Sequence, residues 1–180
     1  RFQILTQPVW IVLNILPFFF IAFMDWEKFD LWRAFTGLDQ PPGEPGSIAP
    51  FEVAKFGAAS AVILALMTQI GEQVDFLRFL PAEKMPKWRH KLGVFLAGAG
   101  WVVVGAPKLL AGSFLAFLAL SAGVSPEHAS EPGYMFAIAF GYMIPNEFLA
   151  LMLMAVFVVI SQLKINVMNA YAGSLAWSNF

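Results

Sequence analysis

Long apolar runs and short polar connectors alternate along the chain. A helix needs roughly 20 mainly apolar residues to cross a bilayer. Because lipid offers no partners to backbone N–H and C=O groups, such runs are expected to be helical. The pattern therefore predicts an all-α integral membrane protein, with residues 1–180 forming one transmembrane domain. The four expected spans are 5–24, 51–80, 92–120 and 147–180, and a shorter outer-loop helix is expected at 134–144.

The charges of the connectors predict the side of the membrane that each one faces. Residues 78–91 carry five Lys or Arg residues against one carboxylate, whereas residues 25–50 are mainly acidic. Lys and Arg accumulate in cytoplasmic loops, so 78–91 is expected inside and 25–50 outside. Residues 27–35 of the outer connector are expected to form a short interfacial helix. The first residue is Arg1 rather than Met, which indicates a piece of a longer protein crossing the inner (cytoplasmic) membrane several times.

Composition supports this class and narrows the chemistry. The chain is 59% hydrophobic and 13% charged, against about 45–50% and 25% in soluble domains. A net charge of -1 without a basic patch argues against a nucleic-acid partner. The absence of Cys excludes disulfides and thiolate chemistry, and His90 and His128 lie in expected loops. No hydrolase or kinase signature is present, so we expect neither an enzyme nor an organic cofactor.

Polar groups interrupt the second segment near its expected inner end. A helix that unwinds at a glycine frees backbone groups to bind a ligand, as in discontinuous transporter helices. We therefore interpret Gln69, Gly71 and Glu72 as candidate substrate contacts. Asp75 and Arg78 are expected to form a charge pair at the interface. Alternatively, the membrane ends near Ile70 and these groups face cytoplasmic water.

Lys108 falls near the middle of the third, glycine-rich segment. A free charge at this depth is costly, so Lys108 is expected either to pair with a carboxylate on a neighbouring helix or to take part in coupling. Glu72 and helices outside the chain are both candidate partners.

The fourth segment carries the strongest candidate site. Its polar and small residues are spaced by three or four positions, so they share one helix face. Amide and hydroxyl groups on one face suit a planar polar ligand or a small cation, although they also form hydrogen bonds between membrane helices. The residues are Gln162, Asn166, Asn169, Gly173 and Ser174.

Two stretches resemble a known family. Residues 162–175, QLKINVMNAYAGSL, resemble the eighth-helix pattern of nucleobase–cation symporter family 1, the purine–cytosine permeases. Residues 74–79, VDFLRF, resemble the end of that family's sixth helix. The resemblance implies helices five to eight of a leucine-transporter-like inverted-repeat fold. It implies transport of a nucleobase or related heterocycle, coupled to Na⁺ or H⁺, by a domain that further helices of the same protein complete.

The resemblance also implies roles for individual residues. Combined with the shared faces above, it gives two sets of expected contacts. The expected substrate contacts are Gln69, Gly71, Glu72, Gln162 and Asn166, and the expected cation contacts are Asn169, Ala172, Gly173 and Ser174.

Two positions depart from the family pattern in ways that bear on coupling. Lys164 stands where a small residue is usual, and Ala172 stands where a Ser hydroxyl is common. Losing an oxygen ligand weakens a site for a hard cation, and Lys164 or Lys108 could supply the charge instead. Coupling to H⁺, or no coupling, is then expected. The alternative function is a permease-like sensor that signals through a cytoplasmic domain outside the chain.

Overall fold

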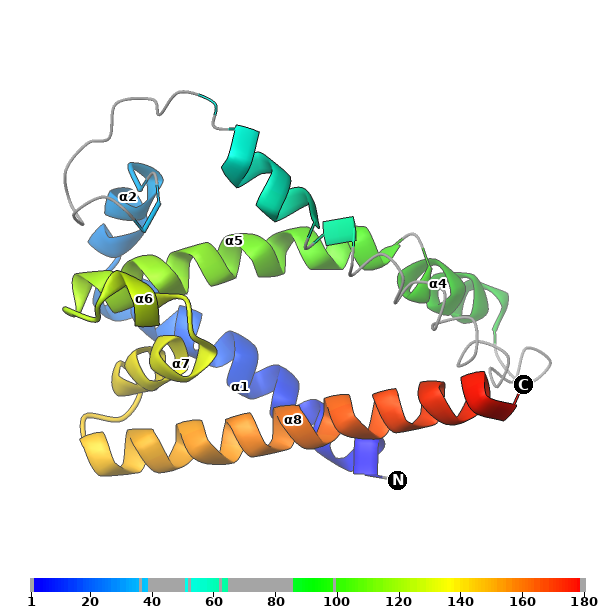
Figure 1. Cartoon of the computed structure of the whole chain (residues 1–180). Helices are drawn as coiled ribbons and strands as arrows, with labels where there is room; N and C mark the ends of the chain where they lie inside the picture. Colours follow the sequence, from blue (N-terminus) through cyan, green and yellow to red (C-terminus); the bar gives the residue numbers. More distant parts are fainter. Residues whose placement is uncertain are drawn as a thin grey trace. The chain divides into compact units, whose positions relative to one another are not determined.

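The computed structural model describes residues 2–35, 37–38, 51, 53–61, 63–64, 86–98 and 100–178. All regular structure within these residues is helical, which confirms the all-α prediction for them (Figure 1). The chain divides into two compact units. Residues 1–48 and 111–180 form the first unit, and residues 49–110 form the second.

The first unit contains most of the described helices. These are α1 (Phe2–Met24), α2 (Glu27–Arg33), the second half of α5 (Gly100–Ser121), α6 (Pro126–Ala129), α7 (Pro132–Gly141) and α8 (Glu147–Ser178). The second unit contains α4 (Lys87–Ala97), the first half of α5 and helical residues at 53–61 and 63–64. Among the described helices, α1 and α8 are long and apolar enough to cross a membrane.

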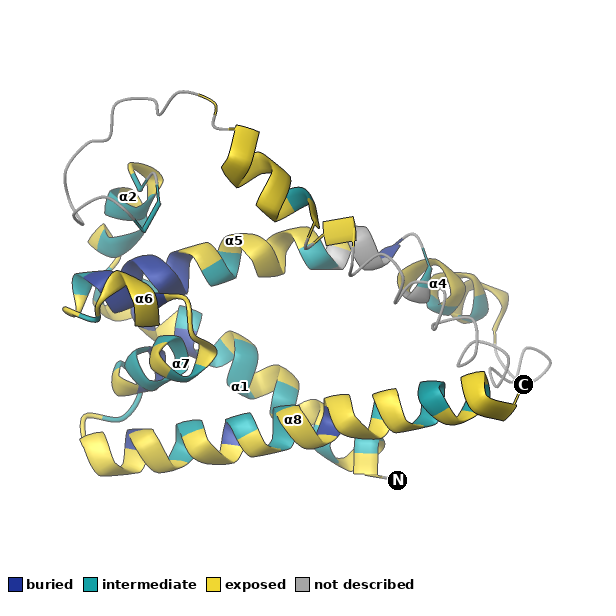
Figure 2. Ribbon diagram, viewed as in Figure 1, coloured by how far each residue is buried: buried dark blue, intermediate teal, exposed yellow. Residues whose placement is uncertain are grey.

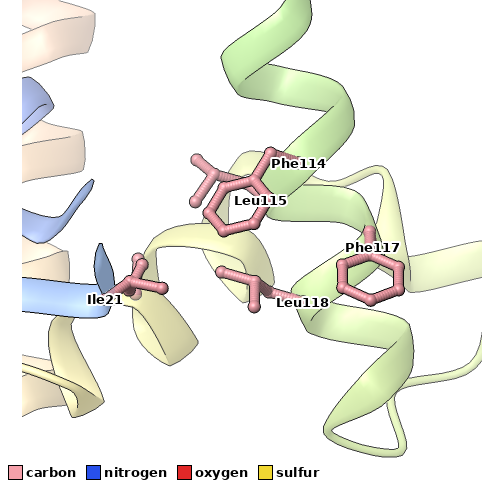
Figure 3. Packing of buried hydrophobic residues seen from close by; sticks show 6 residues of the cluster. Ile21, Phe114, Leu115, Phe117 and Leu118 are labelled. Carbon is pink, nitrogen blue, oxygen red and sulfur yellow. The ribbon is translucent and has the colours of Figure 1, made fainter. Parts of the chain in front are cut away.

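The C-terminal half of α5 forms the core of the first unit. Residues 114–120 are all buried, as the dark blue part of α5 in Figure 2 shows. Phe114, Phe117 and Leu118 lie in one cluster with Ile21 of α1. In Figure 3, Ile21 and Leu118 point toward one another from these two helices. Burial of these side chains ties α1 to α5, since each large apolar side chain contributes about 1.5–3 kcal/mol on burial.

Aromatic rings from two other helices cover Phe114. The ring of Phe29, in α2, stacks on it with centroids 4.3 Å apart, and the ring of Trp32 meets it edge-on at 5.5 Å. Phe18 of α1 approaches within 6.0 Å. The indole Nε1 of Trp32 also donates a hydrogen bond to Ser113 Oγ at 3.2 Å. Helix α2 is therefore held against α5 by ring packing and one polar contact.

A glycine ends α5. Gly123 has a φ of +88°, a conformation that residues with a Cβ seldom adopt. Its N–H bonds to Leu120 O at 2.9 Å, and Val124 N–H bonds to Ala119 O at 3.0 Å. This is the Schellman pattern, which satisfies carbonyls at the end of a helix. The turn leads directly into α6, which begins with Pro126 in its first turn, where a missing N–H is tolerated.

The expected span at 92–120 is divided between two helices. Helix α4 begins at Lys87, and at Gly98 the backbone leaves the helical conformation with a ψ of -116°. A Cβ on Gly100 would lie 2.6 Å from the backbone oxygen of Phe95, so only glycine fits this close approach. The prediction of one continuous span at 92–120 was wrong because the apolar run continues in sequence across the glycines at which the helix breaks. The prediction that both histidines lie in loops was also wrong, since His90 lies in α4 and His128 in α6.

Candidate functional site

Some of the predicted contacts lie outside the described residues. These are Gln69, Gly71, Glu72, Asp75 and Arg78, whose roles stay predictions. Lys108 lies in the part of α5 that belongs to the second unit, and its side chain is exposed. Its expected pairing with Glu72 also stays a prediction. The remaining candidate residues all lie on α8.

Helix α8 has two chemically different faces. One face includes Ala150, Phe157 and Lys164, which are buried, and packs against α1 and α7. An α-helix turns by about 100° per residue, so Lys164 lies about 200° around the axis from Gln162. The amide residues at 162, 166 and 169 therefore point away from the packed face. Figure 2 shows isolated buried positions along a helix that is otherwise largely exposed.

The predicted binding face follows this outer side of α8. Gln162, Asn166 and Asn169 are exposed, and Ala172 and Gly173 are half-buried. Ser174 is exposed, and its Oγ donates to the backbone oxygen of Tyr171, one turn earlier, at 2.7 Å. The face is thus a line of amide groups that ends in a small-residue patch. Within the described chain it is available to a ligand or to another helix.

The packed face of α8 buries a positive charge against α1. The Lys164 side chain is among the buried residues, with 8% of its surface exposed. Its Nζ donates to Gln3 Oε1 at 2.6 Å and to Gln7 Oε1 at 2.7 Å, with Thr6 Oγ1 at 3.5 Å. Thr6 gives its own proton to Phe2 O at 2.8 Å, so its oxygen faces the ammonium as an acceptor. Within the residues that the structure describes, every polar contact of this ammonium is with a neutral group.

Other contacts of the α1 and α8 helices fix the surroundings of Lys164. The Nε2 of Gln3 donates to the backbone oxygen of Lys164 at 2.9 Å. The indole Nε1 of Trp10 donates to Ser161 Oγ at 2.9 Å, and Ser161 Oγ donates to Phe157 O at 2.8 Å. The Trp10 ring centroid lies 5.8 Å from Lys164 Nζ, within the range of a cation–π interaction. We name Gln3, Thr6, Gln7, Trp10, Ser161 and Lys164 the ammonium cluster.

The α1 side of the ammonium cluster was not predicted from the sequence. Gln3, Thr6, Gln7 and Trp10 are spaced as i, i+3, i+4 and i+7, so they form one stripe along a helix. Further along α1, Pro17 and Ile21 are the buried residues of the same helix. Glutamines within an apolar helix are the signal that could have identified this stripe, since amides removed from water need hydrogen-bond partners.

A second polar contact joins the far ends of α1 and α7. Tyr142 follows the last residue of α7, and its side chain forms a hydrogen bond with Asp25, next to the end of α1. Burial raises the pKa of the Tyr142 phenol, and the negative charge of Asp25 and this hydrogen bond raise it further. The phenol therefore stays protonated at neutral pH and donates to the carboxylate.

Comparisons with protein-family models, with curated proteins and with solved structures find no match. The likeness to the purine–cytosine permeases consequently rests on the residues at 74–79 and 162–175.

Proposed function

We propose that the chain is part of a multi-pass inner-membrane transporter for a nucleobase or a related heterocycle, coupled to a cation. The observation that carries the proposal is the division of α8 into a packed face and an amide face. A helix long enough to cross a membrane would leave Gln162, Asn166 and Asn169 in lipid if nothing covered them. Exposed amides in hydrocarbon are costly, so they need a ligand or a partner helix.

Amide groups match the edge of a nucleobase. Each Asn or Gln side chain offers one acceptor oxygen and two donor hydrogens, the same groups that line heterocyclic rings. The line from Gln162 to Asn169 can therefore pair with a planar ring. The small-residue patch at Ala172 and Gly173 lets another backbone or a small ion approach closely. In the leucine-transporter-like fold that we propose, further helices of the same protein complete this site.

Replacing Asn169 with Ala tests the proposed site. We expect the variant to lose at least tenfold in ligand affinity, because a buried polar group of the ligand would lose its hydrogen-bond partner. The measurement is a thermal-shift titration of the full-length protein with nucleobases and hydantoin-like rings, followed by uptake of the best ligand into proteoliposomes. Asn14→Ala is the matched control for loss of an amide elsewhere, because Asn14 lies on α1 and bonds only within that helix in the described contacts, and it should retain the ligand affinity. Unchanged binding by the Asn169 variant would remove this face from the site.

Sodium dependence tests the coupling ion. We expect uptake to continue when choline replaces Na⁺, because Ala172 has no side-chain oxygen to bind the ion and the ammonium of Lys164 supplies a positive charge beside α1. The measurement is initial uptake at fixed pH with and without Na⁺, and then with an imposed proton gradient. Complete loss of uptake in choline would contradict this prediction, because it would show that uptake is coupled to Na⁺ although residue 164 is Lys and residue 172 is Ala.

The burial of Lys164 also favours a second candidate function. A coupling cation moves across the membrane with its substrate, whereas the ammonium of Lys164 is part of the chain and stays in place. This difference suits a membrane sensor, which binds a heterocycle without transporting it. Proteoliposomes distinguish the two functions, since a sensor binds the ligand and accumulates none inside the vesicles.

A further inference from the structure

The number of acceptors around Lys164 matches the number of hydrogens on an ammonium ion. A protonated amine has three N–H donors and no acceptor. The oxygens of Gln3, Gln7 and Thr6 lie at 2.6, 2.7 and 3.5 Å from Nζ. A neutral amine would direct its lone pair at one of these oxygens and lose that contact. The arrangement therefore offers one acceptor oxygen for each hydrogen of an ammonium ion.

We propose that Gln3, Thr6 and Gln7, together with the ring of Trp10, form a binding site for a monovalent primary ammonium ion, which Lys164 fills as a tethered ligand. The oxygens supply the hydrogen-bond acceptors, and the indole face supplies a cation–π contact at 5.8 Å. The site links α1 to α8. It does not depend on which substrate the protein carries.

Two of the groups around the ammonium are held by contacts that do not involve the Lys164 side chain. Gln3 Nε2 donates to the backbone oxygen of residue 164, and this contact survives truncation of the side chain. It fixes the amide plane of Gln3, so that Oε1 remains directed at the position of the ammonium. Trp10 is held in the same way by Ser161. Binding of a separate ion then costs little ordering at Gln3 and Trp10, because these two side chains are already held in place.

The neutral lining of the site determines which charge the bound ion should carry. Three uncharged oxygens compensate one positive charge through charge-assisted hydrogen bonds. An additional carboxylate is not needed for a singly charged ion, and a doubly charged ion would be poorly compensated. We therefore infer selectivity for a small +1 ion that carries N–H groups.

Chemical rescue tests this inference directly. Lys164→Ala removes three methylene groups and the ammonium, so n-propylammonium has the size of the missing part. We expect the Tm of this variant in detergent micelles to fall below that of the wild type. Adding n-propylammonium should then raise it in a saturable way by more than half of the loss, as linkage requires for a ligand of the folded state. The same salt should leave the wild-type Tm unchanged, because Lys164 already fills the site.

Three controls separate binding from cavity filling and from salt effects. n-Propanol has nearly the same volume without the charge, and tetramethylammonium has the charge without N–H groups, so neither should restore the Tm. Adding Gln7→Leu to Lys164→Ala should abolish the response to n-propylammonium. Equal rescue by n-propanol, or an equal shift of the wild type, would overturn the proposal.

A thermodynamic cycle covers the case in which Lys164→Ala does not fold. Lys164→Met keeps most of the side-chain volume and removes the charge. We expect Gln7→Leu to lower the Tm clearly when residue 164 is Lys and at least threefold less when it is Met. Equal losses in the two backgrounds would show that Gln7 does not recognise the ammonium.

Discussion

Replacing Phe114 with Ala is expected to lower the free energy of unfolding of the first unit by about 3–5 kcal/mol. The Phe114 side chain is 1% exposed, and rings from α1 and α2 pack around it. The substitution removes a buried ring and leaves a cavity that rigid neighbours cannot fill. The measurement is denaturant unfolding in micelles, followed by tryptophan fluorescence. Trp32, which contacts the ring edge-on, reports on the same cluster.

Phe23→Ala is the matched control for the Phe114 prediction. Phe23 lies in α1 and is 96% exposed, so the same truncation there should change the free energy of unfolding by about 0.5 kcal/mol or less in micelles. Phe114→Leu should fall between the two variants, since it keeps part of the volume. Similar losses at positions 23 and 114 would contradict the core described for α5.

Replacing Gln3 with Leu is expected to lower the free energy of unfolding by about 1.5–3 kcal/mol, the range for hydrogen bonds to charged groups. Leu has a similar size but can neither accept from Lys164 Nζ nor donate to Lys164 O. One ammonium hydrogen then lacks its partner inside the α1–α8 contact. The measurement is again unfolding in micelles, at a pH where Lys is charged.

Gln162→Leu is the matched control for the Gln3 prediction, because it makes the same change on the exposed side of α8. Its expected effect on stability is within about 0.5 kcal/mol. A loss at position 162 equal to that at position 3 would show that the ammonium cluster contributes nothing specific to stability.

Local patterns predicted the positions of two long helices, and that these helices cross a membrane stays a prediction. The apolar runs at 5–24 and 147–180 correspond to α1, Phe2–Met24, and α8, Glu147–Ser178, because an extended apolar run has few other ways to bury its backbone. The outer-loop helix expected at 134–144 corresponds to α7, Pro132–Gly141. The break near Gly98 was missed because a glycine marks a packing surface or a helix end equally well in sequence.

The candidate site was only partly predictable, for a different physical reason. The spacing of Gln162, Asn166 and Asn169 is a local property, so their common face follows from helix geometry alone. The surroundings of Lys164 depend on residues that precede it by 157–161 positions, and no local pattern shows that Gln3 and Gln7 lie beside it. The partners of Lys164 are therefore known only from the packing of α1 against α8 in the structure. The site at 69–78 stays a prediction.

The composition of the α1 contact surface has a mechanical consequence. At one end, α1 meets α8 through directional bonds at Gln3 and Gln7, and at the other end Pro17 and Ile21 are buried in apolar packing. Water can replace a hydrogen bond at a small net cost, whereas exposing a buried apolar side chain costs much more. The C-terminal end of α1 is thus packed against α5 and α7, whereas its N-terminal end is hydrogen-bonded to α8. Any separation of α1 from α8 would therefore begin at Gln3 and Gln7, while Ile21 keeps the other end of α1 packed against α5.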